Sequence, residues 1–335
     1  MPDSFDRILR IPGFHELIDE LRSALSLYWT TATEVLQGSG IALFDPPAGY
    51  FALENNFFSA LFLYSYHRLE IPRSRRVLYA AVNQCFRGMV TGCDNLLDDE
   101  YKRTLETDLP AKAWRFRSVL DIMVSEHVLF SLLAGASSRG DIPGKKLLQA
   151  VHEALRALTR SGAQEAGEEG GTAEALLPET VLKAIHHYKT GILFQSPWAV
   201  PAVLEQTDAE RTAAVLQGLY QIGMGCQILD DLVDLQRDAR QKRHNYAASL
   251  IYHHQGPDAW AGLRDMTVAE DSAGAAQNLI RQFPDPIGMA VARCRRYLDS
   301  GLQALLGDPP SELVQTVSSI LARRIGADTY MALYP

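Results

Sequence analysis

Helical periodicity is the feature that most restricts how this chain can fold. Apolar residues recur at three- and four-residue intervals over residues 14–36, 76–98, 112–134, 146–159, 179–195, 210–236 and 311–324. This spacing predicts a helix in each segment. We find no clean run that alternates apolar and polar residues between Asn-Gly or Asp-Gly turns, as a half-buried strand would. Breakers such as FDPPAG, EIPRS, RGDIPG and GDPP separate the helical segments. The sequence therefore predicts an all-α protein, a large helical bundle.

Residues 161–175, SGAQEAGEEGGTAEA, interrupt this pattern. They are rich in Gly, Ala and Glu and contain no large apolar residue, a composition typical of a flexible acidic loop. Helical periodicity continues beyond them, so we interpret the loop as an insertion between helices. We expect residues 1–335 to form a single all-helical domain.

Charge and composition narrow the class of protein. The formal net charge of -8 leaves no overall basic footprint for nucleic acid and opposes binding to an acidic membrane surface. The N-terminal MPDSFDRILRIPGF is charged and unlike a secretory signal, and apolar windows such as FFSALFLYSY are too short to span a bilayer. The four cysteines form no C-x-x-C pair. These features predict a cytoplasmic protein with free thiols, no stable membrane insertion and no nucleic-acid partner.

A first acidic stretch, GCDNLLDDEYKR, occupies residues 92–103. Asp94 and Asp98 are four residues apart, so they lie on one helical face, and Asp99 extends the cluster. Like charges at this spacing destabilise a helix unless something positive lies between them. Arg103 follows the acids.

A second acidic stretch, QILDDLVDLQRDARQKR, occupies residues 227–243. Its acids, which recur at three- and four-residue steps, are Asp230, Asp231, Asp234 and Asp238. Lys242 and Arg243 follow. Carboxylate oxygens suit magnesium, whose coordination substrate phosphates complete, and neighbouring cations suit a diphosphate. We therefore predict that the two stretches face each other across a cavity and hold a divalent metal.

Three alternatives to a magnesium site fit the two clusters less well. A charge-rich helix face is often simply solvated, but two clusters embedded in apolar helices are harder to account for in that way. A calcium-binding loop would need glycine at its sixth position, and a di-iron bundle would need Glu-x-x-His pairs. Neither pattern is present.

At these residues the sequence resembles the class I isoprenoid synthases, which include prenyl diphosphate synthases, squalene and phytoene synthases and terpene cyclases. DNLLD, residues 94–98, resembles their first DDxxD motif, with Asn95 replacing the second aspartate. QILDDLVD, residues 227–234, resembles their second motif, and YKTGILF, residues 188–194, resembles a segment whose lysine binds diphosphate. The resemblance covers about residues 75–250.

The resemblance implies an isoprenoid synthase fold with a central apolar cavity, a prenyl diphosphate substrate, Mg²⁺ as cofactor and a possible homodimer. The implied catalytic residues are Asp94, Asp98, Asp231 and Lys189. The implied metal ligands are Asp94, Asp98, Asp99, Asp230, Asp231, Asp234 and Asp238. The implied diphosphate-binding residues are Arg103, Lys189, Lys242, Arg243 and Gln227. The implied pocket residues are Phe86, Met89, Val90 and Phe194.

Departures from the family pattern bear on the reaction. Chain-elongating members carry a Gly-Lys-Arg segment before the first motif, whereas residues 53–67 have no basic cluster of this kind. Arg87 stands where a histidine is usual, and Arg103 alone replaces a double arginine. We therefore expect ionisation of an allylic diphosphate, followed by cyclisation, rearrangement or transfer to a non-standard acceptor. The alternatives are an ordinary trans-polyprenyl diphosphate synthase that adds isopentenyl diphosphate, and a non-catalytic helical partner of a prenyl synthase.

Overall fold

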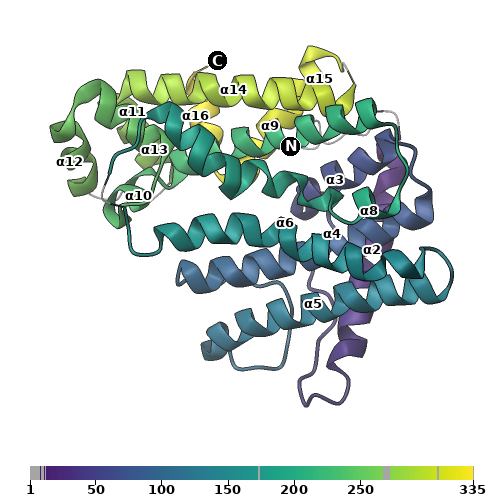
Figure 1. The fold of residues 1–335 in the computed structure, drawn as a ribbon. Coiled ribbons are helices and arrows are strands. Elements are labelled where there is room, and N and C mark those ends of the chain that lie inside the picture. The colour runs from purple at the N-terminus through teal and green to yellow at the C-terminus, as the bar shows by residue number, and fades with distance from the viewer. Residues whose placement is uncertain are drawn as a thin grey trace. The chain divides into compact units, whose positions relative to one another are not determined.

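The protein is all-α, as predicted (Figure 1). The structure, a computed structural model, describes residues 8, 11, 13–172, 174–266, 272–307 and 309–334. In this part of the chain the only strand-like pairing is an isolated antiparallel bridge between Leu43 and Thr107. By its internal contacts the chain divides into two compact units. The N-terminal unit contains residues 9–158 and 196–212, and the C-terminal unit contains residues 1–8, 159–195 and 213–335.

The main helices of the N-terminal unit are α2 (Phe14–Leu36), α3 (Phe57–Arg68), α4 (Arg73–Leu97), α5 (Trp114–Ser138) and α8 (Pro201–Leu204). Short 3₁₀ turns cover Leu53–Asn56, Ala111–Ala113 and Gly144–Lys146. α6 (Leu147–Glu168), a 3₁₀ turn (Leu193–Trp198) and α9 (Ala209–Val233) have residues in both units. The C-terminal unit continues with α7 (Pro178–Thr180), a π-helix (Val181–Gly191), α10 (Leu235–Gln241), α11 (Tyr246–Gln255), α12 (Pro257–Asp265), α13 (Ser272–Gln282), α14 (Pro284–Leu306), α15 (Ser311–Ile325) and α16 (Asp328–Leu333).

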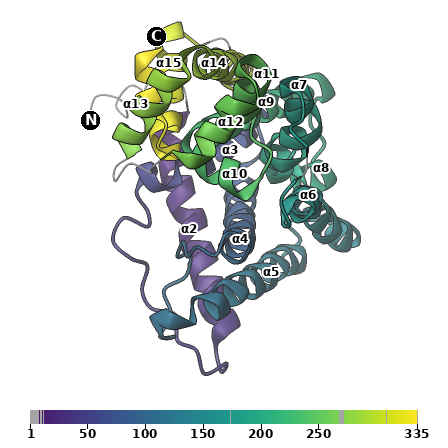
Figure 2. The same ribbon diagram turned by 90° about the vertical axis from the view of Figure 1, so that its left-hand side faces the viewer.

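The N-terminal unit is organised around α4, which packs against both α2 and α5 (Figure 2). Two glycines permit the close approach of α5. A Cβ added to Gly92 would lie 2.7 Å from the Ser118 carbonyl oxygen, and one added to Gly88 would lie 2.1 Å from Ser125 Oγ. The Tyr28 hydroxyl on α2 lies 3.0 Å from the same Ser125 oxygen. These contacts hold in place the helix that carries the first acidic stretch.

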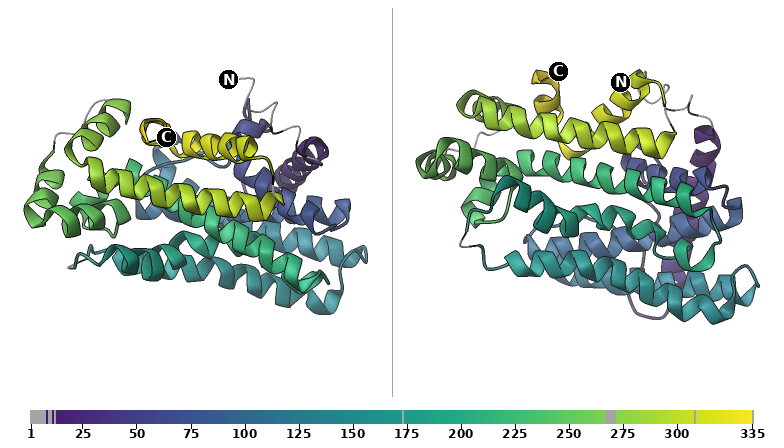
Figure 3. Two further views of the ribbon diagram at one scale, coloured as in Figure 1. Left: turned by 90° about the horizontal axis from the view of Figure 1, so that it is seen from above. Right: turned by 45° about the horizontal axis from the view of Figure 1, so that its top comes forward.

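In the C-terminal unit, α9 and α14 make a similarly close approach (Figure 3). A Cβ on Gly218 would lie 2.9 Å from the Gly301 carbonyl oxygen, and a Cβ on Gly301 would lie 2.8 Å from the Gly218 carbonyl oxygen. Only glycine allows two backbones to come this near each other. α11 packs on α12 and on α14, and α10 also contacts α12 (Figure 2). These contacts fix the end of α9, where the second acidic stretch begins.

Three predicted elements differ from the structure. The predicted loop over 161–175 is wrong in its first half, because α6 remains helical through Glu168; Ala, Gln and Glu are good helix formers. The segment predicted as one helix over 210–236 breaks at Asp234, between α9 and α10. The helix predicted over 179–195 is mostly a π-helix. That residues 1–335 act as a single domain stays a prediction.

One described segment, Ala111–Ser138, is long and apolar enough to cross a membrane by length and composition alone. The mean hydropathy of its most apolar window is 1.6, and 50% of that window is buried inside the protein. The core helix of a globular protein has the same properties, so this finding does not by itself indicate insertion.

Candidate active site

The first acidic cluster lies where α4 ends. The Asp98 backbone N–H donates to the Asp94 carbonyl oxygen at 2.9 Å, so both residues belong to the last turn, as the four-residue spacing predicts. Asp99 has already left the helix, in a left-handed conformation with φ 54°. Its exposed carboxylate pairs with Arg115 at 2.5 Å. Asp94 and Asp98 are half-buried. The cluster thus presents two aspartates at a helix end and a third beyond it.

Asn95 accounts for one departure from the family motif. Its side chain is 1% exposed, and its amide makes two hydrogen bonds with the backbone of Lys102. Nδ2 donates to the Lys102 carbonyl oxygen at 3.0 Å, and Oδ1 accepts from the Lys102 N–H at 2.7 Å. A carboxylate could not donate the first of these bonds. Asn95 therefore closes the loop that follows the cluster.

A hollow of about 210 Å³ opens in the same unit. Its walls are residues 47–50 together with Tyr28, Asn55, Asn56, Gln84, Arg87, Gly88, Arg103 and Thr104. Among these described residues are two guanidinium groups and no carboxylate. Arg87 Nη1 donates to Asn56 Oδ1 at 3.1 Å, and Arg103 pairs with Glu106 at 2.5 Å. The positive lining suits an anionic group.

The second acidic cluster spans the break between α9 and α10. Asp234 occupies the break and pairs with Arg237 at 2.6 Å. Asp238 lies on α10, where it is 8% exposed and accepts from Asn245 Nδ2 at 2.9 Å. The second acidic cluster is therefore divided between two helices. The break re-orients the last aspartate relative to the others.

Asp231 is the most enclosed member of this cluster, at 1% exposure. Its Oδ1 accepts from Gln227 Nε2 at 3.0 Å. Its Oδ2 accepts from the Tyr246 backbone N–H at 2.5 Å and lies 3.0 Å from His186 Nε2. The carboxylate thus connects α9, α11 and the π-helix. This geometry suits an internal anchor, so the predicted ligand role of Asp231 remains a prediction.

Burial and mutual repulsion raise the pKa values of two neighbouring aspartates. Burial, followed by the charges of Asp234 and Asp231, raises the pKa of Asp230 to about 7. Burial and the charge of Asp231 raise the pKa of Asp238 to about 7, although its hydrogen bond from Asn245 opposes the shift. These carboxylates are crowded in a poorly solvated place. A bound cation would lower this electrostatic cost.

Lys189 is the cation that lies among these acids. Burial lowers its pKa, but Glu165, Asp231, Asp238 and Asp230 raise it more, so the pKa stands above its usual value. Its Nζ lies 3.2 Å from Glu165 Oε1. Lys189 lies on the π-helix, which packs tightly on α9: a Cβ added to Gly191 would lie 2.6 Å from the Tyr220 ring. Lys189 is therefore held charged beside the second cluster.

Gln227, another predicted diphosphate ligand, is engaged inside the protein. Its Oε1 accepts a hydrogen bond from the Thr190 hydroxyl, and its Nε2 donates to Asp231. It is 5% exposed. The geometry thus gives Gln227 a part in orienting Asp231, and its predicted contact with diphosphate stays a prediction.

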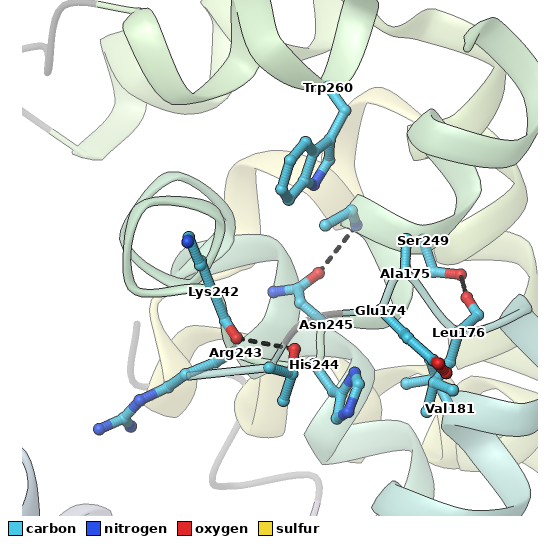
Figure 4. A pocket seen from close by; sticks show the side chains of 12 residues that line it. Glu174, Ala175, Leu176, Val181, Lys242, Arg243, His244, Asn245, Ser249 and Trp260 are labelled. Atoms are coloured by element: carbon cyan, nitrogen blue, oxygen red, sulfur yellow. Dashed lines mark hydrogen bonds between the residues drawn. The ribbon is translucent and has the colours of Figure 1, made fainter. Parts of the chain in front are cut away.

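The loop from Lys242 to Asn245 borders a small cavity of about 50 Å³ (Figure 4). Lys242 has a left-handed backbone, with φ 57°. Thr172, His244 and Trp260 line the cavity, and the Asn245 side chain caps α11 by accepting a hydrogen bond from the Ala248 N–H at 3.0 Å. The Arg243 side chain extends away from the cavity. The two predicted diphosphate-binding cations thus lie on a loop at the end of α10.

The donor set fits magnesium. In the described residues, no three Asp, Glu, His or Cys side chains converge as a closed metal site. Magnesium typically takes one or two carboxylates and completes its shell with water and substrate phosphates, so a closed cage is not expected. Asp94 and Asp98 at the end of α4, and Asp230 and Asp234 at the end of α9, are half-buried, and their role as metal ligands stays a prediction.

Of the four predicted pocket residues, Phe86 is buried at 4% exposure, while Met89, Val90 and Phe194 are half-buried. Phe194 packs against α9, where a Cβ on Gly223 would lie 2.8 Å from its ring. Their role as the wall of a substrate pocket stays a prediction.

Part of the chain is similar in sequence to known proteins. A model of the polyprenyl synthetase family matches residues 111–248, which include Lys189 and the whole second acidic cluster. A geranylgeranyl diphosphate synthase of Pseudescherichia vulneris is 26% identical over 153 residues, covering 45% of this chain and 50% of that protein. The aligned part thus spans about half the length of that curated relative.

Solved structures show the same fold over most of the chain. A geranylgeranyl pyrophosphate synthetase of the archaeon Geoglobus acetivorans superposes with TM-score 0.62 at 16% identity, over 91% of this chain and 99% of that one. A polyprenyl synthase of Caulobacter crescentus, solved with calcium and isoprenyl diphosphate, superposes with TM-score 0.61 at 16% identity, over 92% of this chain and 97% of that one. The chain therefore has the fold of these solved prenyl synthases. The predicted isoprenoid synthase fold is confirmed.

Several residues around the second acidic cluster are not identified by the sequence analysis. His186 contacts Asp231, and His187 Nδ1 lies 3.0 Å from the Tyr220 hydroxyl. Asn245 could have been found, since Asn before an apolar helical run is a typical N-cap. Glu165 could not, because nothing in the sequence links it to Lys189.

Proposed function

We propose that this protein is a class I isoprenoid synthase, a magnesium-dependent enzyme that elongates an allylic prenyl diphosphate with isopentenyl diphosphate. The observation that carries the proposal is Lys189, held protonated among buried carboxylates within the segment that the polyprenyl synthetase model matches. A cation fixed beside metal-binding acids suits a substrate that brings both negative oxygens and bound metal.

The proposed reaction begins with loss of diphosphate from the allylic substrate. The proposed magnesium ligands are Asp94 and Asp98 on α4 and Asp230 and Asp234 at the end of α9, and magnesium would supply Lewis-acid stabilisation of the departing diphosphate. Lys189 and Lys242 would contribute fixed positive charge at the same oxygens. No nucleophilic side chain is required. The enzyme's role is to stabilise developing negative charge on the leaving group and to exclude water from the reacting carbon.

The hollow in the N-terminal unit favours elongation over cyclisation. A cyclase needs one anion site, whereas elongation needs a second for isopentenyl diphosphate. The hollow adjoins α4 two turns before Asp94 and offers Arg87 and Arg103, with no carboxylate among its described lining residues. The comparisons with polyprenyl synthases likewise support the elongation alternative over the cyclisation that the altered upstream segment suggested.

The test uses purified protein, magnesium and allylic diphosphates of increasing length, each with and without isopentenyl diphosphate. Elongation predicts pyrophosphate release only when both substrates are present, with a longer prenyl diphosphate as product. Arg87→Ala should then raise the KM for isopentenyl diphosphate about tenfold, equivalent to roughly 1.4 kcal/mol, and leave that of the allylic substrate nearly unchanged. Release without isopentenyl diphosphate would support a cyclase, and no release in any combination would favour a non-catalytic partner.

We also propose a homodimer formed through α5 and a cytoplasmic location without membrane insertion. Phe116, Met123 and Phe130 are 51%, 53% and 43% exposed and follow one another at seven-residue intervals. A two-fold axis at Met123 would pair Phe116 of each copy with Phe130 of the other, giving a self-complementary apolar face. Met123→Lys should convert a dimer to a monomer in sedimentation. A wild-type monomer at micromolar concentration would refute this pairing.

A further inference from the structure

The end of α6 is a segment that the proposed chemistry does not use. It carries Ser161, Glu165 and Glu168, spaced four and three residues apart and therefore on one face of the helix. Thr172 follows four residues after Glu168. We call Ser161, Glu165, Glu168 and Thr172 the α6 clamp. The side chains of all four contact segments that carry predicted diphosphate-binding cations.

The first half of the α6 clamp holds Lys189. Ser161 Oγ donates to the Lys189 carbonyl oxygen at 2.6 Å, and Glu165 Oε1 lies 3.2 Å from Lys189 Nζ. One contact fixes the backbone, and the other fixes the ammonium group. The side chain of Lys189 is 20% exposed and that of Glu165 is 23% exposed, so the ion pair is shielded from most of the solvent.

The second half holds the loop after the second acidic cluster. Glu168, 5% exposed, accepts from the His244 N–H at 3.0 Å. The Thr172 N–H and hydroxyl both donate to the Lys242 carbonyl oxygen, at 2.8 and 2.9 Å. Lys242 has a left-handed backbone, which L residues adopt only at a cost. The clamp thus stabilises the strained residue at the point where the chain turns.

The composition of the segment agrees with this role. Residues 161–172 contain no large apolar side chain, so the segment contributes little to a hydrophobic core. The polar contacts of the clamp instead converge on Lys189 and on residues 242–244. A Gln164–Glu168 hydrogen bond at 3.1 Å lies within the helix itself. A purely structural helix end would not need to reach two separate cationic segments.

We infer that the α6 clamp consists of positioning residues that set the spacing between Lys189 and the Lys242–Arg243 loop, so that both cations can bind the same diphosphate. This inference rests on the proposed function. It gives a positioning role to the end of α6, a segment whose sequence resembles a flexible insertion. Because the clamp touches the cations and not the substrate, its loss should weaken diphosphate binding more than it slows the chemical step.

The experiment compares Thr172→Val with Thr172→Ser in the full-length protein. Valine keeps the shape and the backbone donor but loses the hydroxyl, whereas serine keeps the hydroxyl. Loss of one hydrogen bond, about 1 kcal/mol, predicts a roughly fivefold rise in the KM for the allylic diphosphate with Thr172→Val, little change in kcat, and recovery with Thr172→Ser. Glu169→Gln, an exposed change in the same segment, should leave both constants within about twofold of wild type.

A second measurement separates this inference from the proposed function. Binding of inorganic pyrophosphate with magnesium, measured by calorimetry, needs no turnover and should weaken about fivefold in Thr172→Val. If wild type is active and Thr172→Val changes neither KM nor pyrophosphate affinity, the clamp has no positioning role. If wild type turns over no substrate yet binds pyrophosphate in a Thr172-dependent way, the proposed reaction fails while the clamp stands. If wild type binds no pyrophosphate, both are overturned.

Discussion

His186 Nε2 lies 3.0 Å from Asp231 Oδ2, and both side chains are essentially inaccessible to solvent. The pair joins the π-helix to α9, and the Tyr246 N–H adds α11 to the same carboxylate. A buried carboxylate with several partners stabilises a fold only while all of them remain. The second acidic cluster therefore contains one residue on which the folding of its surroundings depends.

Asp231→Ala should consequently destabilise the protein by about 3–5 kcal/mol, since it leaves the Tyr246 N–H and His186 without their buried partner. The free energy of unfolding in urea measures this. Asp99→Ala, which removes an exposed ion pair with Arg115, should change stability by less than about 1 kcal/mol. Equal stability of the two variants would show that Asp231 is not an anchor.

Asp121 on α5 should make stability depend on pH. Burial raises its pKa to about 7, against the opposing contacts of Thr104 and Arg117. Because the folded pKa is above the unfolded value of 3.8, the stabilisation is present below about pH 4 and is lost as pH rises through about 7. The loss amounts to at most about 4 kcal/mol.

Asp121→Asn removes this titration and keeps the shape of the side chain. The variant should match wild type near pH 4 and exceed it in stability near pH 8, as measured by thermal unfolding across that range. Asp141→Asn, at an exposed site paired with Arg139, should leave the pH profile unchanged. Parallel profiles for Asp121→Asn and wild type would contradict the assignment.

Two glycines should respond in opposite directions to alanine. Gly162 lies in α6 with nothing within 4 Å of an added Cβ, so Gly162→Ala should stabilise by about 0.5–1 kcal/mol. At Gly223 a Cβ would lie 2.8 Å from the Phe194 ring and 2.9 Å from the Thr190 carbonyl oxygen. Gly223→Ala should destabilise by about 1–3 kcal/mol. Melting temperatures that shift in the same direction would invalidate this account of the π-helix packing.

Magnesium and pyrophosphate together should raise the melting temperature of the wild-type protein. At a ligand concentration about a hundred times Kd, the stabilisation is about 2.7 kcal/mol. Asp94→Ala should abolish most of this shift, because the half-buried aspartate belongs to the proposed metal-binding set. Asp141→Ala serves as the control. A full shift in Asp94→Ala would remove Asp94 from that set.

The sequence predicted the fold class and the positions of both acidic clusters, because both depend on local patterns. Apolar periodicity placed α4 and α9 to within a few residues. It could not place the break at Asp234, since the residues on both sides favour helix, and tertiary contacts such as Asn245 with Asp238 decide the turn. The α6 clamp was equally hidden, because its partners lie far along the chain.

The π-helix shows why the side chains around Lys189 resist assignment from sequence. Its hydrogen bonds close over five residues instead of four, so each residue turns through a smaller angle than on an ordinary helical wheel. By Lys189, eight residues after Val181, that difference has accumulated enough to move a side chain to another face. A deletion that restored ordinary α-helical winding before Lys189 would rotate Lys189 away from Glu165. An engineered relative with this stretch shortened would thus keep Lys189 in its sequence, but its ammonium group would no longer lie beside Glu165.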